Sequence, residues 1–259
     1  MSQFSHLPLN ARNFCGSALP EKMDPDSHQQ RVSAFERLLM IGGDERTLSL
    51  GEDIYVLQRL PGGYAIFLGD EEYASIHMNS QGGELQNNTN LDVDQLLVKL
   101  RAQATRDEFL PIFLDTSKVT ILHPNFGNIE VSRTLDEKIQ IQLIDLHAWL
   151  VFGPSGSVDY NPLQLDTEKT SSEILASWRI SMIQEFLGDQ SRASLDVSDR
   201  IPLTVTRDNL GAYTIVTPKG RPVVIEGSGQ LAANPNCIDI DYFISLLASR
   251  PGSFGESAA

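Results

Sequence analysis

Stretches with helical and with strand-like spacing of apolar residues alternate along the chain. Residues 32–40 place apolar side chains three and four positions apart, which predicts a helix, and Gly42 and Gly43 provide its C-terminus. Residues 92–104 have the same spacing and predict a second helix. Between these helices, three segments alternate apolar and polar residues and predict a small antiparallel meander: residues 54–58, 64–68 and 73–78.

The second half of the chain has a related order of predicted elements. A helix is expected over residues 170–189, where Thr170 and Glu173 fit a capping box and Gly188 ends the helix. Strands are expected on both sides of this helix, and the last element is an amphipathic helix over residues 237–249. The predicted strands are residues 118–122, 138–144 and 147–152 before the helix, and residues 201–207, 212–217 and 221–226 after it.

Parts of the first half recur in the second half at a nearly constant distance. The recurring pairs are Gly43-Asp44 with Gly188-Asp189, Tyr64-Ala-Ile66 with Tyr213-Thr-Ile215, and Asp92-Val-Asp94 with Asp239-Ile-Asp241. Their offsets lie between 145 and 149 residues. We predict an α+β fold of tandem helix–three-stranded antiparallel meander–helix units that pack as a pseudo-dimer. The alternative is a chance similarity between amphipathic segments.

The element pattern divides the chain into four parts. Residues 1–30 lack a sustained period and are predicted to be a mobile leader, and residues 251–259 a loose tail. Residues 31–165 form the first predicted α+β unit, with additional strands, and residues 166–250 form the second.

Charge narrows the classes of partner. The chain has 20 basic and 34 acidic residues, and the formal net charge is −14. A negative field repels phosphate backbones and anionic lipids, so nucleic acid and membrane insertion are not expected, whereas a cationic protein segment is a suitable partner. The alternative is a solvated acidic surface without a partner. No apolar run reaches the ~18 residues of a membrane span, and the N-terminus lacks a signal-peptide pattern, so we predict a cytoplasmic protein.

Candidate chemistry is sparse in this sequence. Cys15 and Cys237 are too few for a disulfide framework or a thiolate zinc site, and the five histidines lack metal-binding spacing. The carboxylate pairs Asp92/Asp94 and Asp239/Asp241 are either hard-cation ligands or, as we predict, capping residues of helices. We therefore predict no metal site and no cofactor.

One fragment, DLHAW, has the composition of a catalytic site. On a strand, Asp145, His147 and Trp149 would share one face, and the carboxylate could orient the imidazole. The sequence provides no nucleophile beside them. The alternative is a structural Asp–His pair, so Asp145 and His147 are only a secondary catalytic hypothesis.

The order of helix, three strands, helix, further strands and helix resembles the class I type III secretion chaperones, the Tir-chaperone or CesT/SycE-like family. The resemblance implies a non-enzymatic virulence protein whose sheet faces hold an unfolded secretion segment in extended form. Members of this family form homodimers, and a covalent tandem would replace the second subunit. The segments that carry the resemblance are Val32–Met40, Ile54–Gln58, Tyr64–Leu68, Tyr73–Met78 and Asp92–Ala104, with a partial second copy over residues 174–249.

We predict that the chain is a cytosolic, acidic protein-binding module, in the form of a secretion chaperone that holds an extended cargo segment. Uncovered meander faces would bind the partner, through Tyr64, Phe67, Tyr213 and Ile215, although each of these residues also suits a core position. The alternative is a host-delivered effector enzyme, a hydrolase or transferase, with the N-terminal leader as its secretion signal. The sequence leaves the partner, the oligomeric state, the role of the leader and any catalysis open.

Overall fold

The computed structural model describes residues 28–69, 74–114, 116–196, 202–217, 222–234 and 239–248. Within these ranges, four α-helices alternate with three five-stranded antiparallel sheets, which we name sheets A, B and C in chain order. Most of the predicted leader, the predicted tail and both cysteines lie outside the described residues. The predicted leader extends to residue 30, whereas the first helix begins at His28.

Sheet A follows helix α1 (His28–Gly42) and is a meander whose strands pair in chain order. Two-residue turns join its first three strands, because Leu50 pairs with Asp53 and Leu60 pairs with Gly63. Helix α2 (Val93–Asp107) follows the sheet. The strands of sheet A are β1 (Glu45–Leu50), β2 (Asp53–Leu60), β3 (Gly63–Leu68), β4 (Ser75–Asn79) and β5 (Glu84–Asn87).

One face of sheet A and the helices α1 and α2 enclose the first hydrophobic core. Strand β2 contributes Tyr55 and Leu57 to this core, and its alternate residues Ile54 and Val56 point to the opposite face. The helices contribute apolar stripes at helical spacing, among them Phe35, Leu38 and Leu39 from α1 and Leu96, Leu97 and Leu100 from α2.

Sheet B follows α2 and a short 3₁₀ helix, η1 (Leu110–Phe113), and it leads into helix α3 (Thr167–Leu187). The capping box predicted at Thr170 is wrong, because Asp166 is the N-cap: its carboxylate accepts a 3.0 Å hydrogen bond from the Lys169 amide, and Thr170 is buried within the helix. The strands are β6 (Lys118–His123), β7 (Gly127–Arg133), β8 (Ile139–Leu143), β9 (Ala148–Phe152) and β10 (Val158–Tyr160), with the 3₁₀ turn η2 (Ile144–Leu146) between β8 and β9.

Sheet C follows α3 and leads into the last described helix, α4 (Ile240–Ala248). Its core residues join those of sheet B, α3, α4 and η1 in one second hydrophobic core. The strands are β11 (Arg192–Leu195), β12 (Leu203–Arg207), β13 (Tyr213–Val216), β14 (Val223–Ile225) and β15 (Leu231–Ala233).

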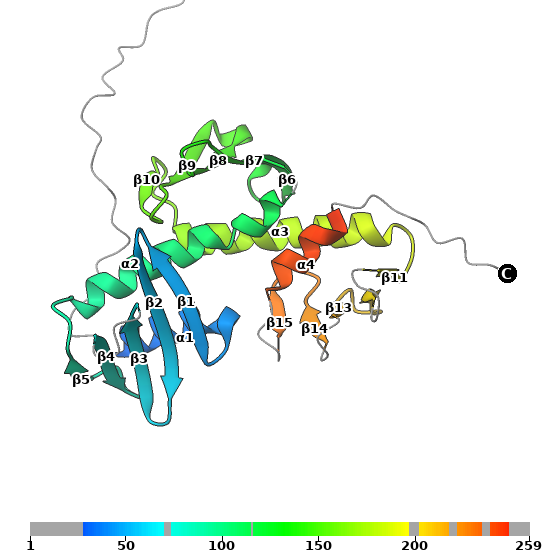
Figure 1. The fold of residues 1–259 in the computed structure, drawn as a ribbon. Coiled ribbons are helices and arrows are strands. Elements are labelled where there is room, and N and C mark those ends of the chain that lie inside the picture. Colours follow the sequence, from blue (N-terminus) through cyan, green and yellow to red (C-terminus); the bar gives the residue numbers. More distant parts are fainter. Residues whose placement is uncertain are drawn as a thin grey trace, which may run out of the picture.

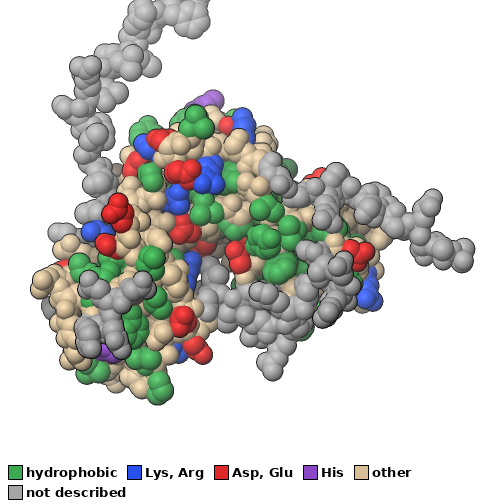
Figure 2. All heavy atoms as spheres, viewed as in Figure 1, with side chains coloured by type: hydrophobic (Ala, Val, Ile, Leu, Met, Phe, Trp, Pro, Cys, Tyr) green, Lys and Arg blue, Asp and Glu red, His purple; other side chains and the backbone are tan. Residues whose placement is uncertain are grey.

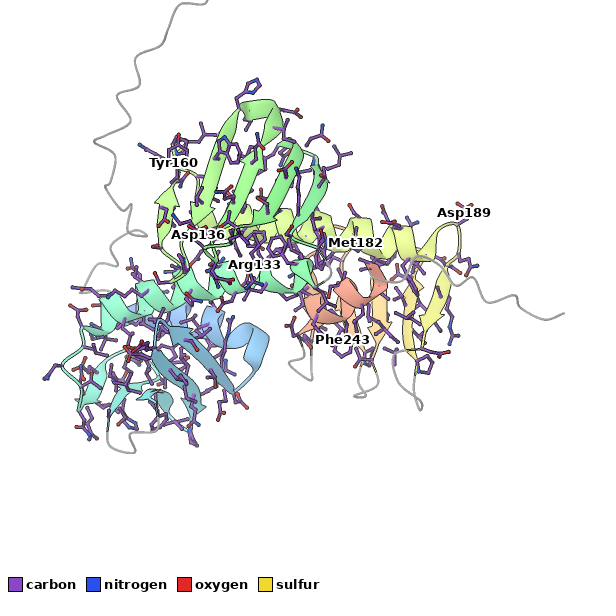
Figure 3. All side chains as sticks on the ribbon, turned by 45° about the horizontal axis from the view of Figure 1, so that its top comes forward. Arg133, Asp136, Tyr160, Met182, Asp189 and Phe243 are labelled. Carbon is purple, nitrogen blue, oxygen red and sulfur yellow. The ribbon has the colours of Figure 1, made fainter. Side chains whose placement is uncertain are left out.

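The helices form a central row from which the sheets project on two sides. Sheets A and C lie on one side of helices α2 and α3, and sheet B lies on the other (Figure 1). The rotated view shows the same arrangement, with α3 passing between sheets B and C (Figure 3). Consecutive helices contact each other along this row. Each sheet therefore packs one face on helices and leaves the other face outside this row.

The predicted pair of helix–three-strand–helix units in a pseudo-dimer is wrong. The described chain has three sheets, and each has five strands. The repeat offset of 145 to 149 residues relates α1, sheet A and α2, which we name the first unit, to α3, sheet C and α4, which we name the third unit. Sheet B lies between them along the chain and forms the middle unit with α2 and α3, which it shares with its neighbours. Edge strands such as β5 (ELQN) and β11 (RASL) are short and largely polar, because one of their sides has no neighbouring strand, so they lack the alternation that marks a central strand. The predicted boundary between residues 165 and 166 falls in the loop between β10 and α3.

A repeated contact explains the similarity of the first and third units. Arg31 of α1 binds both carboxylate oxygens of Asp94, at 2.7 and 2.8 Å, and donates to the carbonyl of Gly82 at 3.4 Å. Arg179 of α3 binds Asp241 and the carbonyl of Gly229 in the same way. In each unit the arginine therefore ties its helix to the next helix and to the turn before the last strand of the sheet.

The middle unit uses a different residue for the same connection. Arg101 of α2 donates two 2.7 Å hydrogen bonds to Glu168 in the first turn of α3, and Arg37 of α1 also pairs with Glu168 at 2.7 Å. Each successive pair of helices is thus joined by a bidentate arginine–carboxylate contact.

Candidate protein-binding surface

Three of the four residues predicted to bind a partner are core residues. Tyr64, Tyr213 and Ile215 are 7%, 1% and 0% exposed, respectively. The Tyr64 hydroxyl donates a 2.5 Å hydrogen bond to Glu36, and Tyr213 accepts a 3.3 Å hydrogen bond from Gln184. The prediction that these three side chains bind a partner is therefore corrected, because they point toward the helices.

Phe67 differs from Tyr64 because the two residues lie three positions apart on one strand and point to opposite faces. The Phe67 side chain lies on the face of sheet A that is turned away from α1 and α2, and it is partly exposed. Phe67 thus belongs to a different surface from the other three predicted residues.

The outer face of sheet A, by which we mean Ile54, Val56, Ala65, Phe67 and His77, is apolar at its centre. Val56 lies directly opposite Phe67, and the Phe67 ring meets the His77 ring edge-on with centroids 5.8 Å apart. Ile54 is 48% exposed at one end of this row. Figure 2 shows hydrophobic side chains over sheet A on the side turned to the viewer. No described helix or strand packs over this face.

The outer faces of sheets B and C have more polar positions, although sheet B also exposes Leu122 and Trp149. Gln142 and Glu130 occupy opposed positions on sheet B, and Thr206 and Thr214 occupy opposed positions on sheet C. An antiparallel sheet with one solvated face usually places polar residues on that face. The apolar outer face of sheet A departs from this rule, and exposed apolar patches of this kind are typical of interaction sites.

The cations of the first unit lie on its helix side. Arg59 pairs with Glu36 at 2.5 Å and with Asp44 at 3.1 Å, and Arg46 donates to the carbonyl of Leu38 at 2.9 Å. Burial, together with the hydrogen bond to the Glu36 carboxylate, raises the pKa of Tyr64 to about 12. This network fixes α1 to the inner face of sheet A and leaves no arginine on the outer face.

Asp145 and His147 do not share a strand face. Residues 144–146 form the 3₁₀ turn η2, and His147 follows it with a left-handed φ of 49°. The Asp145 carboxylate accepts a 3.1 Å hydrogen bond from the Asn128 amide, and both Asp145 and His147 are exposed. The carboxylate therefore holds the turn, and the strand geometry that supported the catalytic hypothesis is absent.

The carboxylate pairs at the helix starts have structural partners. Asp92 caps α2 by accepting from the Asp94 and Gln95 amides at 2.9 and 3.1 Å, and Asp239 accepts from the Tyr242 amide at 3.1 Å. Asp94 and Asp241 bind arginines, as described above. Within the described ranges, no group of three or more His, Cys, Asp or Glu residues is placed to hold a metal ion.

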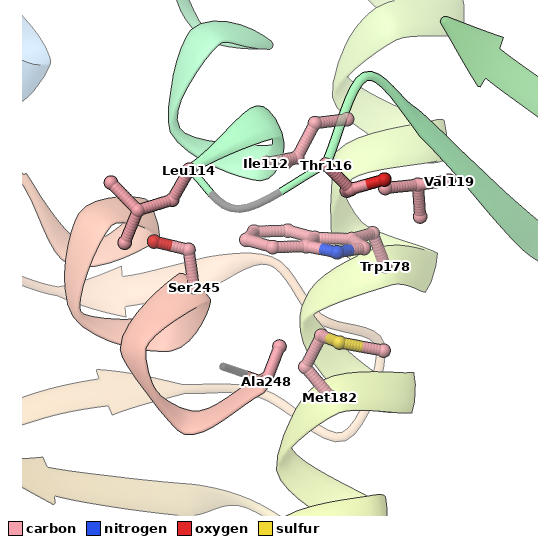
Figure 4. A pocket seen from close by; sticks show the side chains of 8 residues that line it. All are labelled: Ile112, Leu114, Thr116, Val119, Trp178, Met182, Ser245 and Ala248. Carbon is pink, nitrogen blue, oxygen red and sulfur yellow. The ribbon is translucent and has the colours of Figure 1, made fainter. Parts of the chain in front are cut away.

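A small apolar pocket of about 190 Å³ lies where η1, β6, α3 and α4 meet (Figure 4). The Trp178 indole forms its floor between Ile112 and Met182, and Leu114 borders it on the side of α4. Pockets for small molecules usually measure ~300 to 1,000 Å³, so this one suits a single apolar side chain better than a cofactor. The sequence marks Trp178 only as part of a helix stripe, because the pocket needs four elements that are distant along the chain.

No family model, curated protein or solved structure matches the chain. In the part of the chain that the structure describes, no helix is both long and apolar enough to cross a membrane.

Proposed function

We propose that this chain is a protein-binding module and that the outer face of sheet A holds a segment of another protein. The observation that carries the proposal is the uncovered apolar row of Ile54, Val56 and Phe67 on that face. Fully burying a side chain of this kind contributes ~1.5 to 3 kcal/mol, so a partner that covers the exposed parts of three such residues gains a specific anchor.

The resemblance to the class I type III secretion chaperones favours one form of this proposal, in which the chain is a secretion chaperone. In that form the bound segment is secretion cargo, held in extended form against the sheet. A cytoplasmic location belongs to the same proposal and agrees with the two cysteines of the chain, which are too few for a disulfide framework. The proposal assigns no catalytic role to Asp145 or His147.

This proposal is tested by affinity purification of the full chain from its native cytosol. The proteins that copurify with the wild type are compared with those that copurify with the test variant Ile54→Ser/Phe67→Ala. The matched control is Val216→Ser, because Val216 is an apolar residue, 36% exposed, on the outer face of sheet C. Thermal unfolding of all three proteins shows whether each variant remains folded.

The expected result is a stoichiometric partner that copurifies with the wild-type and Val216→Ser proteins and is lost from the double variant. Equal retention by the folded double variant would show that another surface binds the partner. Absence of any stoichiometric partner for the wild-type protein would contradict the proposed function itself.

A further inference from the structure

The apolar pocket at Trp178 lies beside the last turn of helix α4, and the residues that follow α4 contain one side chain suited to fill it. We infer that Phe254 folds back into this pocket and closes it. The inference concerns the second hydrophobic core, and it is independent of the proposed function, which concerns sheet A.

The described residues that line the pocket are mostly apolar, and none of them is charged. The Trp178 indole and the Met182 side chain line it from α3 (Figure 4). Its polar side chains among the described residues are Thr116 and Ser245, and the Ser245 hydroxyl donates a 2.7 Å hydrogen bond to the carbonyl of Tyr242. The pocket therefore favours an occupant that contributes apolar contacts rather than one that needs hydrogen bonds.

The pocket is open on the side of Leu114. This leucine is 44% exposed, although its side chain borders the pocket between η1 and α4 (Figure 4). A space of about 190 Å³ suits one large apolar side chain, as described above. An aromatic ring in this space would cover Leu114 and contact the Trp178 indole, and aromatic pairs are stabilised beyond the area that they bury.

Phe254 is close enough along the chain to reach the pocket. Ala248 is the last residue of α4 and itself lines the pocket. Phe254 follows six positions later, so the connection between the two residues can span up to ~20 Å. The dipeptide Pro251-Gly252 lies between them and is typical of turns, which allows the chain to reverse its direction.

The sequence after α4 offers no other large apolar side chain. Residues 249–259, SRPGSFGESAA, lie outside the described residues, and Phe254 is their one aromatic or large aliphatic residue. A short flexible tether gives an attached group an effective concentration in the ~mM range. A side chain from a second copy or another protein lacks this advantage, so the geometry favours the chain's own phenylalanine as the occupant.

Trp178 provides a reporter inside the pocket. The chain has two tryptophans, and Trp149 is 39% exposed on the outer face of sheet B, so Trp149→Phe leaves Trp178 as the single emitter. Acrylamide quenching of the full chain with this substitution then measures access of the quencher to the pocket. The test variant is Phe254→Ser, and the conservative variant is Phe254→Leu. The matched control is Phe14→Ser, which makes the same change near the N-terminus.

We expect the quenching constant of Trp178 to rise about twofold in Phe254→Ser, because the pocket loses its occupant. It should stay unchanged in Phe14→Ser and nearly unchanged in Phe254→Leu. The Tm of Phe254→Ser should fall by about 2 to 4 °C, the shift that a loss of about 1 kcal/mol causes in a chain of this size. Equal quenching in Phe254→Ser and Phe14→Ser would overturn the inference.

A second variant tests whether Phe254 acts at this pocket. Leu114→Ser changes the rim of the pocket at an exposed position, so the protein should remain folded. It should raise the quenching constant when Phe254 is present and add little in Phe254→Ser, because contacting residues are not additive. Fully additive effects would place Phe254 elsewhere and overturn the inference.

A peptide and the oligomeric state distinguish the possible occupants. A synthetic peptide of residues 249–259, at the ~mM concentration that the tether supplies, should restore the protection of Trp178 in Phe254→Ser. The same peptide with serine in place of phenylalanine should not. If light scattering shows a dimer that Phe254→Ser converts to a monomer, the phenylalanine of a second copy occupies the pocket, and the inference is overturned.

Discussion

Arg179 and Asp241 join helices α3 and α4 through two hydrogen bonds, each 2.6 Å long, between side chains that are 10% and 9% exposed. The same bidentate contact joins Arg31 to Asp94 in the first unit. Burial makes these contacts critical, because removal of one partner leaves the other charge without compensation. The contacts between successive helices thus depend on a few side chains whose loss should strongly destabilise the folded state.

Asp241→Ala should destabilise the protein by about 3 to 5 kcal/mol, because it leaves Arg179 buried and unpaired. The matched control is Asp44→Ala, since Asp44 also pairs with an arginine but its side chain is 82% exposed, and its loss should cost about 0.5 kcal/mol. Urea unfolding of both variants measures the difference. Similar values for the two would show that the α3–α4 contact does not hold the structure.

Glycine is required at the turn that Arg179 contacts. Gly229 has a φ of +85°, and a Cβ there would overlap the carbonyl of Ala176 on α3. Gly229→Ala should therefore cost about 3 kcal/mol or more, since the turn must move away from the helix.

Gly211→Ala is the control for this effect, because Gly211 has a φ of +84° and no atom within 4 Å of the added Cβ. Gly211→Ala should lower the free energy of unfolding by only ~1 to 2 kcal/mol, which is the cost of holding a residue with a Cβ in the left-handed backbone conformation. Chemical unfolding of the two variants separates backbone strain from steric overlap, and equal losses would remove the role assigned to the contact with α3.

Glu108 should make the protein less stable as the pH rises toward neutrality. Burial raises the pKa of this carboxyl from 4.5 to about 7, although Arg46, Arg179 and Arg37 oppose the shift and Asp241 adds to it. Because the folded state holds the proton more tightly than the unfolded state, the stabilisation is present below pH ~4.5 and is lost as the pH passes 7.

Glu108→Gln should remove this dependence. The difference in unfolding free energy between the variant and the wild type should shift by about 2 kcal/mol in favour of the variant between pH 5 and pH 8. One pKa unit corresponds to ~1.4 kcal/mol, and the effect is reduced because part of the Glu108 side chain reaches solvent. Unfolding free energies from pH 5 to 8 measure the effect. Parallel curves for the two proteins would contradict the prediction.

Tyr64 should ionise later than most of the six tyrosines, because its pKa is raised to about 12 by burial and by Glu36. An absorbance titration at 295 nm should lose one high-pH transition in Tyr64→Phe. The wild type should also lose stability above pH ~10, where the unfolded phenol ionises first. Glu36→Gln should shift the same transition to lower pH, and an unchanged titration would show that Glu36 does not contribute.

The long segments with apolar residues at helical spacing predict helices at the positions where the structure has them. The stripes around Phe35, Leu97 and Trp178 all face cores. Asp92 and Asp239 cap helices as predicted, whereas Asp94 and Asp241, predicted to be caps as well, bind arginines. Strand β7 was detectable, because Ile129 and Val131 alternate with polar residues, but it is absent from the predicted strands. The predicted helix boundary at Thr170 is wrong because a second capping residue, Asp166, lies four positions earlier.

The sequence alone determined the helical stripes, most of the central strands, the acidic charge and the recurrence of short segments at an offset of 145 to 149 residues. It could not determine which face of sheet A is the core, because β2 and β3 have apolar residues on both faces. Tyr64 and Phe67 are both aromatic residues of β3 and lie on opposite faces of the sheet, so the sequence does not show which of the two is buried. Only the packing of α1 and α2 on one side decides this, and it leaves Phe67 outside. The number of sheets also depends on long-range pairing, because short polar edge strands are stabilised by hydrogen bonds to their neighbours rather than by a pattern of their own.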